Sequence, residues 1–260
     1  MILTDIVSNR VIALELSEDI SDLRGWSERV RPRYGYLPTV SEICSPCPTH
    51  RDVYLTRVEG FKAEGAALEN GRLTHEAFLV PFKLAIRDIC DINRYADIKR
   101  ILLNRTSSSE VRRLISKIYD HASAMALQWL FSGKPLPIAV EPKVRASLVG
   151  FSDTVRPDLV IGVVPYEFAS SYWPNKELAV VAYAMALEAT SLVPVNYGVL
   201  VYPSREGLRY KVVHATENLR KKVLNLRDEI ARIVYYKEDP GPANKMSCPR
   251  SCPFWRVCHG

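Results

Sequence analysis

The sequence predicts a mixed α/β fold, in which helices flank a mixed sheet and a helical cap precedes it. Two observations support this class. In the first half of the chain, apolar residues recur at the spacing of helices. In the second half, short segments rich in β-branched and aromatic residues are punctuated by proline and alternate with helical segments. The order of three strands, helix, two strands and helix indicates one α/β core.

The first half of the chain is predicted to be mainly helical. Residues 1–38 are expected to form a helical or mixed lead-in, followed by a short element at residues 39–48 that prolines interrupt. Helical periodicity predicts three helices, at residues 51–58, 71–93 and 108–133. Ser107 or Ser108 is placed to cap the third. Cys90 falls within the second helix and is expected to be a buried apolar residue.

The second half alternates between strands and helices. Strands are predicted at residues 136–144, 147–151, 159–167, 197–202 and 208–213. Helices are predicted at residues 175–190 and 217–235. We therefore expect three regions: a helical region with a cap at residues 1–134, a core at residues 135–236, and a cysteine-rich tail at residues 237–260.

Composition limits the class of protein. With 260 residues and 47% apolar content, the chain can bury a large core, but it has no run approaching the roughly 18–20 apolar residues of a membrane span. The charged N-terminus does not resemble a signal peptide, so we expect a cytoplasmic protein without a membrane partner. A net charge of +6 weakly favours a polyanionic partner. Gln128 is the only glutamine among many Lys and Glu residues, which suggests a thermophilic archaeal source.

The six cysteines follow a pattern that suits a metal or cluster site. One group is Cys44-x2-Cys47, and the other is Cys248-x3-Cys252-x5-Cys258. Prolines follow three of them and keep the local chain non-helical. Four thiolates can hold an iron–sulfur cluster, which we favour, or a structural zinc. In a thermophile, disulfides between these cysteines are a third possibility.

Two carboxylates are candidates for a divalent-cation site. Asp158 is placed at the start of a strand and Glu167 on the following strand. Carboxylate oxygens suit Mg²⁺ or Mn²⁺. Glu167 lies between Tyr166 and Phe168, where burial of a carboxylate is costly unless it is paired or bound to a metal. Taken alone, this spacing is a weak signal, and a turn aspartate with a strand-edge glutamate is the simpler interpretation.

Three further polar residues carry weaker signals. His75 begins a helix, where a single histidine is usually structural or exposed. Lys176 and Tyr183 lie seven residues apart on one helix face, and together could contact a DNA phosphate. On these residues alone, a surface lysine and a core tyrosine are the simpler interpretation.

The order of these motifs between Val40 and Cys258 resembles the RecB-like nucleases that carry an iron–sulfur cluster. That order is a Cys-Pro element, Gly-x3-His, Pro-Asp, a strand Glu, a helix Tyr and three C-terminal cysteines. Within this family the chain is similar to the fourth Cas protein family, in its archaeal type I-A variant. The resemblance implies a PD-(D/E)xK restriction-endonuclease-like core, with an iron–sulfur subdomain joining the N- and C-terminal regions.

The resemblance also implies site residues, carried over position by position. The implied ligands of Mn²⁺ or Mg²⁺ are His75, Asp158, Glu167 and the Phe168 carbonyl. The implied cluster ligands, for a 4Fe-4S rather than a 2Fe-2S cluster, are Cys47, Cys248, Cys252 and Cys258, with Cys44 as a competitor of Cys47. Asp158, Glu167, Lys176 and Tyr183 would form the catalytic set.

The chain departs from the family pattern at two catalytic positions. The lysine of Glu-x-Lys is Ala169, and the glutamine of Gln-x3-Tyr is Ala179, although Tyr183 is kept. Lys176 is the candidate for a lysine that has moved. A lesser departure is the three-residue gap between Cys248 and Cys252, where two residues are more usual.

Three hypotheses about function follow. The first is a metal-dependent exonuclease that processes single-stranded prespacer ends in CRISPR spacer acquisition, with DNA and the CRISPR integrase proteins as partners. The second is a weakly active or inactive iron–sulfur subunit that binds DNA and assists the integrase in prespacer selection. The third is a zinc-stabilised nucleic-acid-binding protein without enzymatic activity.

Overall fold

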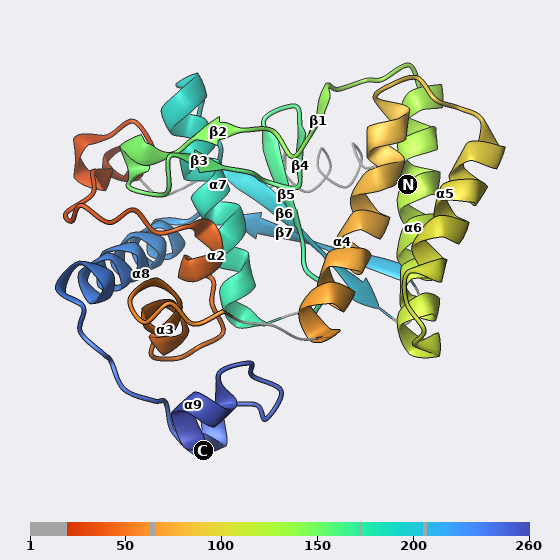
Figure 1. The fold of residues 1–260 in the computed structure, drawn as a ribbon. Helices are drawn as coiled ribbons and strands as arrows, with labels where there is room; N and C mark the ends of the chain where they lie inside the picture. Colours follow the sequence, from red (N-terminus) through yellow and green to blue (C-terminus); the bar gives the residue numbers. More distant parts are fainter. Residues whose placement is uncertain (1–19, 63–65, 172, 205–206) are drawn as a thin grey trace.

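The computed structural model describes residues 20–62, 66–171, 173–204 and 207–260. It has a five-stranded sheet with helices on both faces (Figure 1). Strand order is β1 (Ile138–Val140), β4 (Leu159–Ile161), β5 (Val164–Phe168), β6 (Tyr197–Ser204) and β7 (Gly207–His214). Only β5 and β6 are parallel, so the mixed sheet predicted from sequence is confirmed. Of the predicted lead-in, residues 1–19 lie outside the described residues.

Alternation along the strands separates two cores. Tyr166 and Phe168 face the core that holds α4 (Ala66–Ala85), α5 (Ile92–Asn104) and α6 (Ser109–Phe131). Because successive strand residues point to opposite faces, Glu167 faces the other side. That side is covered by α7 (Glu177–Ser191), α8 (Glu217–Tyr236) and the short α2 (Val40–Ile43) (Figure 1). Helix α7 makes the crossover that parallel strands β5 and β6 require.

The cap helices differ in their bounds from the prediction. The helix expected at residues 71–93 begins earlier and ends at Ala85. A turn with Asp88 at a φ of 57° follows, and the Asp91 side chain caps α5 by accepting from the amide of Asn93. Cys90 therefore lies in a loop and is exposed, so its predicted burial in a helix was wrong. The predicted cap of α6 is confirmed as Ser108, whose hydroxyl accepts from the amide of Val111.

The segment at residues 147–151 is not a strand. It forms η3 (Ser147–Val149) and then a turn at Gly150, whose φ is 79°. The guanidinium of buried Arg227, on α8, donates to the carbonyls of Val149 and Val30. A Cβ at Gly150 would lie 3.0 Å from that guanidinium, so the close approach requires glycine. The neighbouring β2 (Val144–Arg145) and β3 (Thr154–Val155) form a separate two-stranded sheet.

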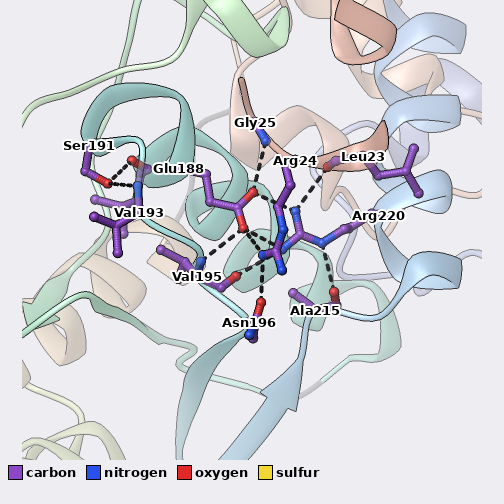
Figure 2. A network of polar contacts seen from close by, with 11 residues as sticks. Leu23, Arg24, Gly25, Glu188, Ser191, Val193, Val195, Asn196, Ala215 and Arg220 are labelled. Atoms are coloured by element: carbon purple, nitrogen blue, oxygen red, sulfur yellow. Dashed lines mark hydrogen bonds and ion pairs between the residues drawn. The ribbon is translucent and has the colours of Figure 1, made fainter. Parts of the chain in front are cut away.

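A buried carboxylate anchors the first described segment to the core (Figure 2). Glu188, on α7, accepts from Arg24 Nη1 at 2.5 Å and from the amides of Gly25 and Val195 at 2.9 and 3.0 Å. It also accepts two hydrogen bonds from Arg220 of α8, at 2.7 and 2.9 Å. Burial alone would raise the pKa of Glu188, but these donors hold it below its ordinary value. The network joins α7 and α8 to the chain around η1 (Ser21–Leu23) and η2 (Glu28–Val30).

The C-terminal tail lies beside the N-terminal Cys-Pro element. Helix α9 (Trp255–His259) is preceded by η5 (Lys245–Ser247) and lies near α3 (Arg51–Arg57) (Figure 1). Arg51 forms two hydrogen bonds to Asp239, at 2.9 and 2.8 Å, and Thr49 donates to the carbonyl of Gly241. Within the described parts of the chain, every helix is too short or too polar to cross a lipid bilayer.

Candidate active site and cysteine pocket

Asp158 and Glu167 are brought together by the pairing of β4 with β5. Leu159 pairs with Tyr166 in an antiparallel register, so Asp158 and Glu167, the residues next to that pair, lie opposite each other at the same end of the hairpin. Both are almost fully buried, at 4% and 6% exposure. Two carboxylates in such a place destabilise one another unless cations or donors compensate for their charge.

Asp158 is held by one backbone donor and one imidazole. Its Oδ2 accepts from the amide of Phe168 at 2.7 Å and lies 3.1 Å from Nε2 of His75, which comes from α4. The Phe168 ring meets the His75 ring edge-on, with centroids 5.5 Å apart. Burial would lower the pKa of His75, but the hydrogen bond and charge of Asp158 outweigh it and raise that pKa. The imidazole is therefore held against the carboxylate.

Glu167 is paired with Lys176, the last residue of η4 (Pro174–Lys176). Lys176 Nζ lies 2.5 Å from Glu167 Oε1, with the side chains only 15% and 8% exposed. Burial and the charge of Asp158 raise the pKa of Glu167 to about 7, against the opposing effect of Lys176. Burial would lower the pKa of Lys176, but Glu167 raises it, so the ammonium is stabilised in place.

Tyr183, on α7, lies on the side of the sheet that Glu167 faces. Burial raises the pKa of its phenol well above the ordinary value, and Glu167 and Asp158 raise it further. The hydrogen bond between Tyr183 and Glu167 contributes in the same direction. The phenol therefore keeps its proton and acts as a neutral donor to a carboxylate of this site.

The two positions that depart from the family pattern are packed in the core. Ala169 and Ala179 are both 1% exposed and belong to the apolar cluster around α7. A methyl group thus occupies the position directly after β5 where the resemblance expects a lysine. The amino group beside Glu167 comes instead from the next element along the chain.

Two residues near Lys176 were not recognised from sequence as part of this site. Trp173 donates its indole N–H to the carbonyl of Cys44 at 2.9 Å, and its ring centroid lies 5.4 Å from Lys176 Nζ. The thiol of Cys44 is buried, and burial raises its pKa. The charge of nearby Lys176 lowers this pKa, and that of Glu167 raises it. The only available signal was a tryptophan three residues before a lysine, across a proline.

Four of the other five cysteines gather in a second place, the cysteine pocket. It is lined by Cys47, Arg51, Asp52, Ala243, Cys248, Cys252, Phe254, Trp255, Cys258 and His259. Burial raises the pKa of the Cys248 thiol, and so do Cys47, Cys252 and Cys258, which shows their proximity. The pocket thus groups Cys47, and not Cys44, with the three C-terminal cysteines.

The donor chemistry of both places fits the ions that the sequence predicts. Carboxylates and an imidazole suit Mg²⁺ or Mn²⁺, and four free thiols suit an iron–sulfur cluster or zinc. Among the residues that the structure describes, no three His, Cys, Asp or Glu side chains are positioned to hold a metal ion as they stand. Both ligand sets therefore stay predictions.

The chain is similar in sequence to known proteins over nearly its whole length. A family model described as CRISPR-associated exonuclease Csa1 matches residues 7–260. A protein named CRISPR-associated exonuclease Csa1 from Thermoproteus tenax is 28% identical over 91% of this chain and 90% of its own length. Another of the same name, from Saccharolobus solfataricus, is 25% identical over 98% of this chain and 97% of its own. The resemblance drawn from the motifs is confirmed: the chain belongs to the CRISPR-associated exonuclease Csa1 family.

Proposed function

We propose that the chain is a divalent-metal-dependent DNA exonuclease that processes single-stranded prespacer ends during CRISPR spacer acquisition. The observation that carries this proposal is the buried pair of Lys176 and Glu167, beside Asp158 and His75. The names of the relatives, CRISPR-associated exonucleases, support the class of reaction. Single-stranded DNA is the proposed substrate, and the CRISPR integrase proteins are the proposed partners.

Asp158, Glu167, His75 and the Phe168 carbonyl would hold the cation. When bound, Mg²⁺ or Mn²⁺ would make water a better nucleophile and offset negative charge on the phosphate. Asp158 keeps His75 oriented through their 3.1 Å contact, and the amide of Phe168 fixes Asp158 in turn. These contacts hold two of the proposed ligating side chains, Asp158 and His75, before substrate arrives, which reduces the cost of ordering them.

Lys176 would supply the positive charge that the missing Glu-x-Lys lysine provides elsewhere. An ammonium group held near the scissile phosphate stabilises the negative charge that develops in the transition state. Tyr183 keeps its proton because burial and the carboxylates raise the pKa of its phenol. It would donate to Glu167 and limit the orientations that this carboxylate can adopt.

The cysteine pocket would hold a 4Fe-4S cluster through Cys47, Cys248, Cys252 and Cys258. Its position between α3 and α9 joins parts of the chain separated by about two hundred residues, and closing so long a loop restricts the unfolded chain. We assign it a structural role in fixing the tail against the Cys-Pro element.

A second candidate function is a DNA-binding subunit with weak or no cleavage activity. The burial of Ala169 and Ala179 among apolar side chains favours it, because neither position contributes a polar group to the site. Such a subunit would retain DNA in the presence of Mn²⁺ or Mg²⁺ without shortening it, and would assist the integrase in choosing prespacers.

The test is cleavage of end-labelled single-stranded DNA by anaerobically purified protein with Mn²⁺. We expect wild type to shorten the DNA and Asp158→Asn to lose activity, although the variant keeps an oxygen that can accept from the amide of Phe168. Asp158→Ala should lose activity too, with its circular dichroism unchanged. Wild-type rates in both variants would refute the site. A wild type that binds DNA without cleaving it would favour the second candidate.

A further inference from the structure

We propose that Trp173 positions Lys176, and that residues 44–47 make this position depend on the cysteine pocket. We call residues 44–47 the linking segment. The inference rests on the proposed function, because that proposal assigns Lys176 a role in catalysis. It adds a positioning residue that none of the sequence motifs contains, together with a route by which the pocket affects the nuclease site.

The first step is the contact of Trp173 with both sides. Its indole N–H donates to the carbonyl of Cys44 at 2.9 Å, which fixes the ring at one edge. The ring centroid lies 5.4 Å from Lys176 Nζ, within the range over which an aromatic face attracts an ammonium group. A single side chain therefore connects the backbone of the linking segment to the lysine of the site.

The second step is the anchoring of the linking segment. Its first two residues, Cys44 and Ser45, are buried at 2% and 4% exposure. The hydroxyl of Ser45 accepts from the amide of Cys47 at 3.0 Å and donates to Asp52 Oδ2 at 2.5 Å. Both Cys47 and Asp52 line the cysteine pocket. One serine hydroxyl thus joins two wall residues of the pocket to the segment that holds the indole.

The third step is the need of Lys176 for a second contact. A lysine side chain is flexible, and Glu167 is the partner that holds its ammonium group at 2.5 Å. Any ligand that occupies the Glu167 carboxylate weakens that pair. The face of Trp173 then keeps the ammonium group at the site, because a ring attracts a cation without competing for the carboxylate.

The experiment measures how fast Lys176 reacts with an amine-specific acylating reagent, relative to exposed Lys62, by mass spectrometry of the folded protein. Trp173→Leu removes both the ring and the N–H, and should raise the relative rate at Lys176 about tenfold. Trp173→Phe keeps a ring but loses the donor, and should give a smaller rise. The matched control is Trp26→Leu, because Trp26 contacts Arg24 in the same way at 6.0 Å. The control should leave the rate unchanged.

The linking segment is tested by Ser45→Ala, which removes the shared hydroxyl and leaves every cysteine in place. We expect Ser45→Ala to raise the Lys176 rate in the wild-type background and to add nothing in Trp173→Leu, because the two act in series. An unchanged rate in Trp173→Leu would overturn the positioning role. Additive effects of the two variants would overturn the link to the pocket.

Cleavage assays on the same variants separate this inference from the proposed function. Trp173→Leu should lower kcat for single-stranded DNA by up to about 10²-fold with little change in KM, since a displaced group costs rate more than binding. Acylation of Lys176 requires no cleavage activity. An inactive wild type with a Trp173-dependent rate would refute the nuclease alone, whereas an active wild type with no such dependence would refute the positioning role alone.

Discussion

Lys176 Nζ lies 2.5 Å from Glu167 Oε1, in a pair whose side chains are almost excluded from solvent. The lysine comes from the turn before α7 and the glutamate from β5, nine positions earlier in the chain. In the Glu-x-Lys pattern both residues would belong to one strand. Here Ala169, directly after β5, takes the position of that lysine and packs in the core, so the charge reaches the carboxylate from a different element.

The first prediction separates the cysteines by position. Cys47→Ser should lose the iron and acid-labile sulfide of anaerobically purified protein, because Cys47 lines the cysteine pocket. Cys44→Ala should retain them, since Cys44 is buried near Lys176 and Glu167 instead. Exposed Cys90→Ser is the matched control and should retain them as well. Loss of iron in Cys44→Ala, with full iron in Cys47→Ser, would reverse the assignment.

The second prediction concerns the buried network of Figure 2. Glu188→Gln should lower the free energy of unfolding at pH 7 by about 3–5 kcal/mol, because Arg220 would be left as a buried charge without its partner. The exposed control Glu69→Gln, which removes a surface pair with Arg72, should leave it nearly unchanged. Chemical denaturation followed by circular dichroism measures both. Equal effects would contradict the structural role of Glu188.

The same network should make stability depend on pH. The pKa of Glu188 is below its ordinary value in the folded protein, so its stabilising effect is complete above the unfolded carboxyl pKa of about 4.3. It is lost as the pH falls through the folded pKa. The difference in free energy of unfolding between wild type and Glu188→Gln should therefore shrink between pH 5 and pH 3, taken as about the range of carboxyl titration. A constant difference would show that the carboxylate charge is not involved.

The third prediction is that divalent-cation binding depends on pH through Glu167. Its pKa is raised to about 7, and a carboxylate must lose its proton to bind a cation. The affinity for Mn²⁺ should therefore rise with pH through neutrality, with uptake of a proton by the buffer. Calorimetry in two buffers that differ in ionisation enthalpy measures this proton. Glu167→Gln should weaken the pH dependence, and the part that remains belongs to His75, a proposed ligand whose pKa is also raised. A proton release of unchanged size in that variant would exclude Glu167 as a source.

Much of the fold could be predicted because periodicity directly reports which side of an element is buried. The alternation of strands and helices around α7 followed from the second half of the chain. The hairpin that brings Asp158 and Glu167 together did not, because residues 159–167 were expected to form one strand and instead form β4 and β5. The conformation of residues 147–151 did not follow. Their apolar residues fit a strand, but Arg227 from a distant helix takes the Val149 carbonyl that a ladder would need.

The surroundings of Lys176 show the same limit in the site. The contact with Glu167 was within reach of sequence reasoning, since both residues were candidates and the motif lacked a lysine. The role of Trp173 could not be predicted, because its partner is a backbone carbonyl 129 positions away. Every residue has such a carbonyl, so the sequence does not show which one accepts the hydrogen bond. The separation of Cys44 from Cys47 likewise depends on packing. Two cysteines three residues apart face different parts of the molecule.

The most direct test of the account is cleavage of end-labelled single-stranded DNA with Mn²⁺ by wild type, Lys176→Ala and Lys176→Arg. We predict that Lys176→Ala lowers kcat about 10²- to 10³-fold, the range seen when one group that stabilises transition-state charge is removed. Lys176→Arg keeps the charge but alters its geometry, and should retain part of the activity. Asp158→Asn gives the background rate of cleavage when the cation site does not work. Cleavage by Lys176→Ala at the wild-type rate would contradict the claim that this lysine takes the place of the one missing at Ala169.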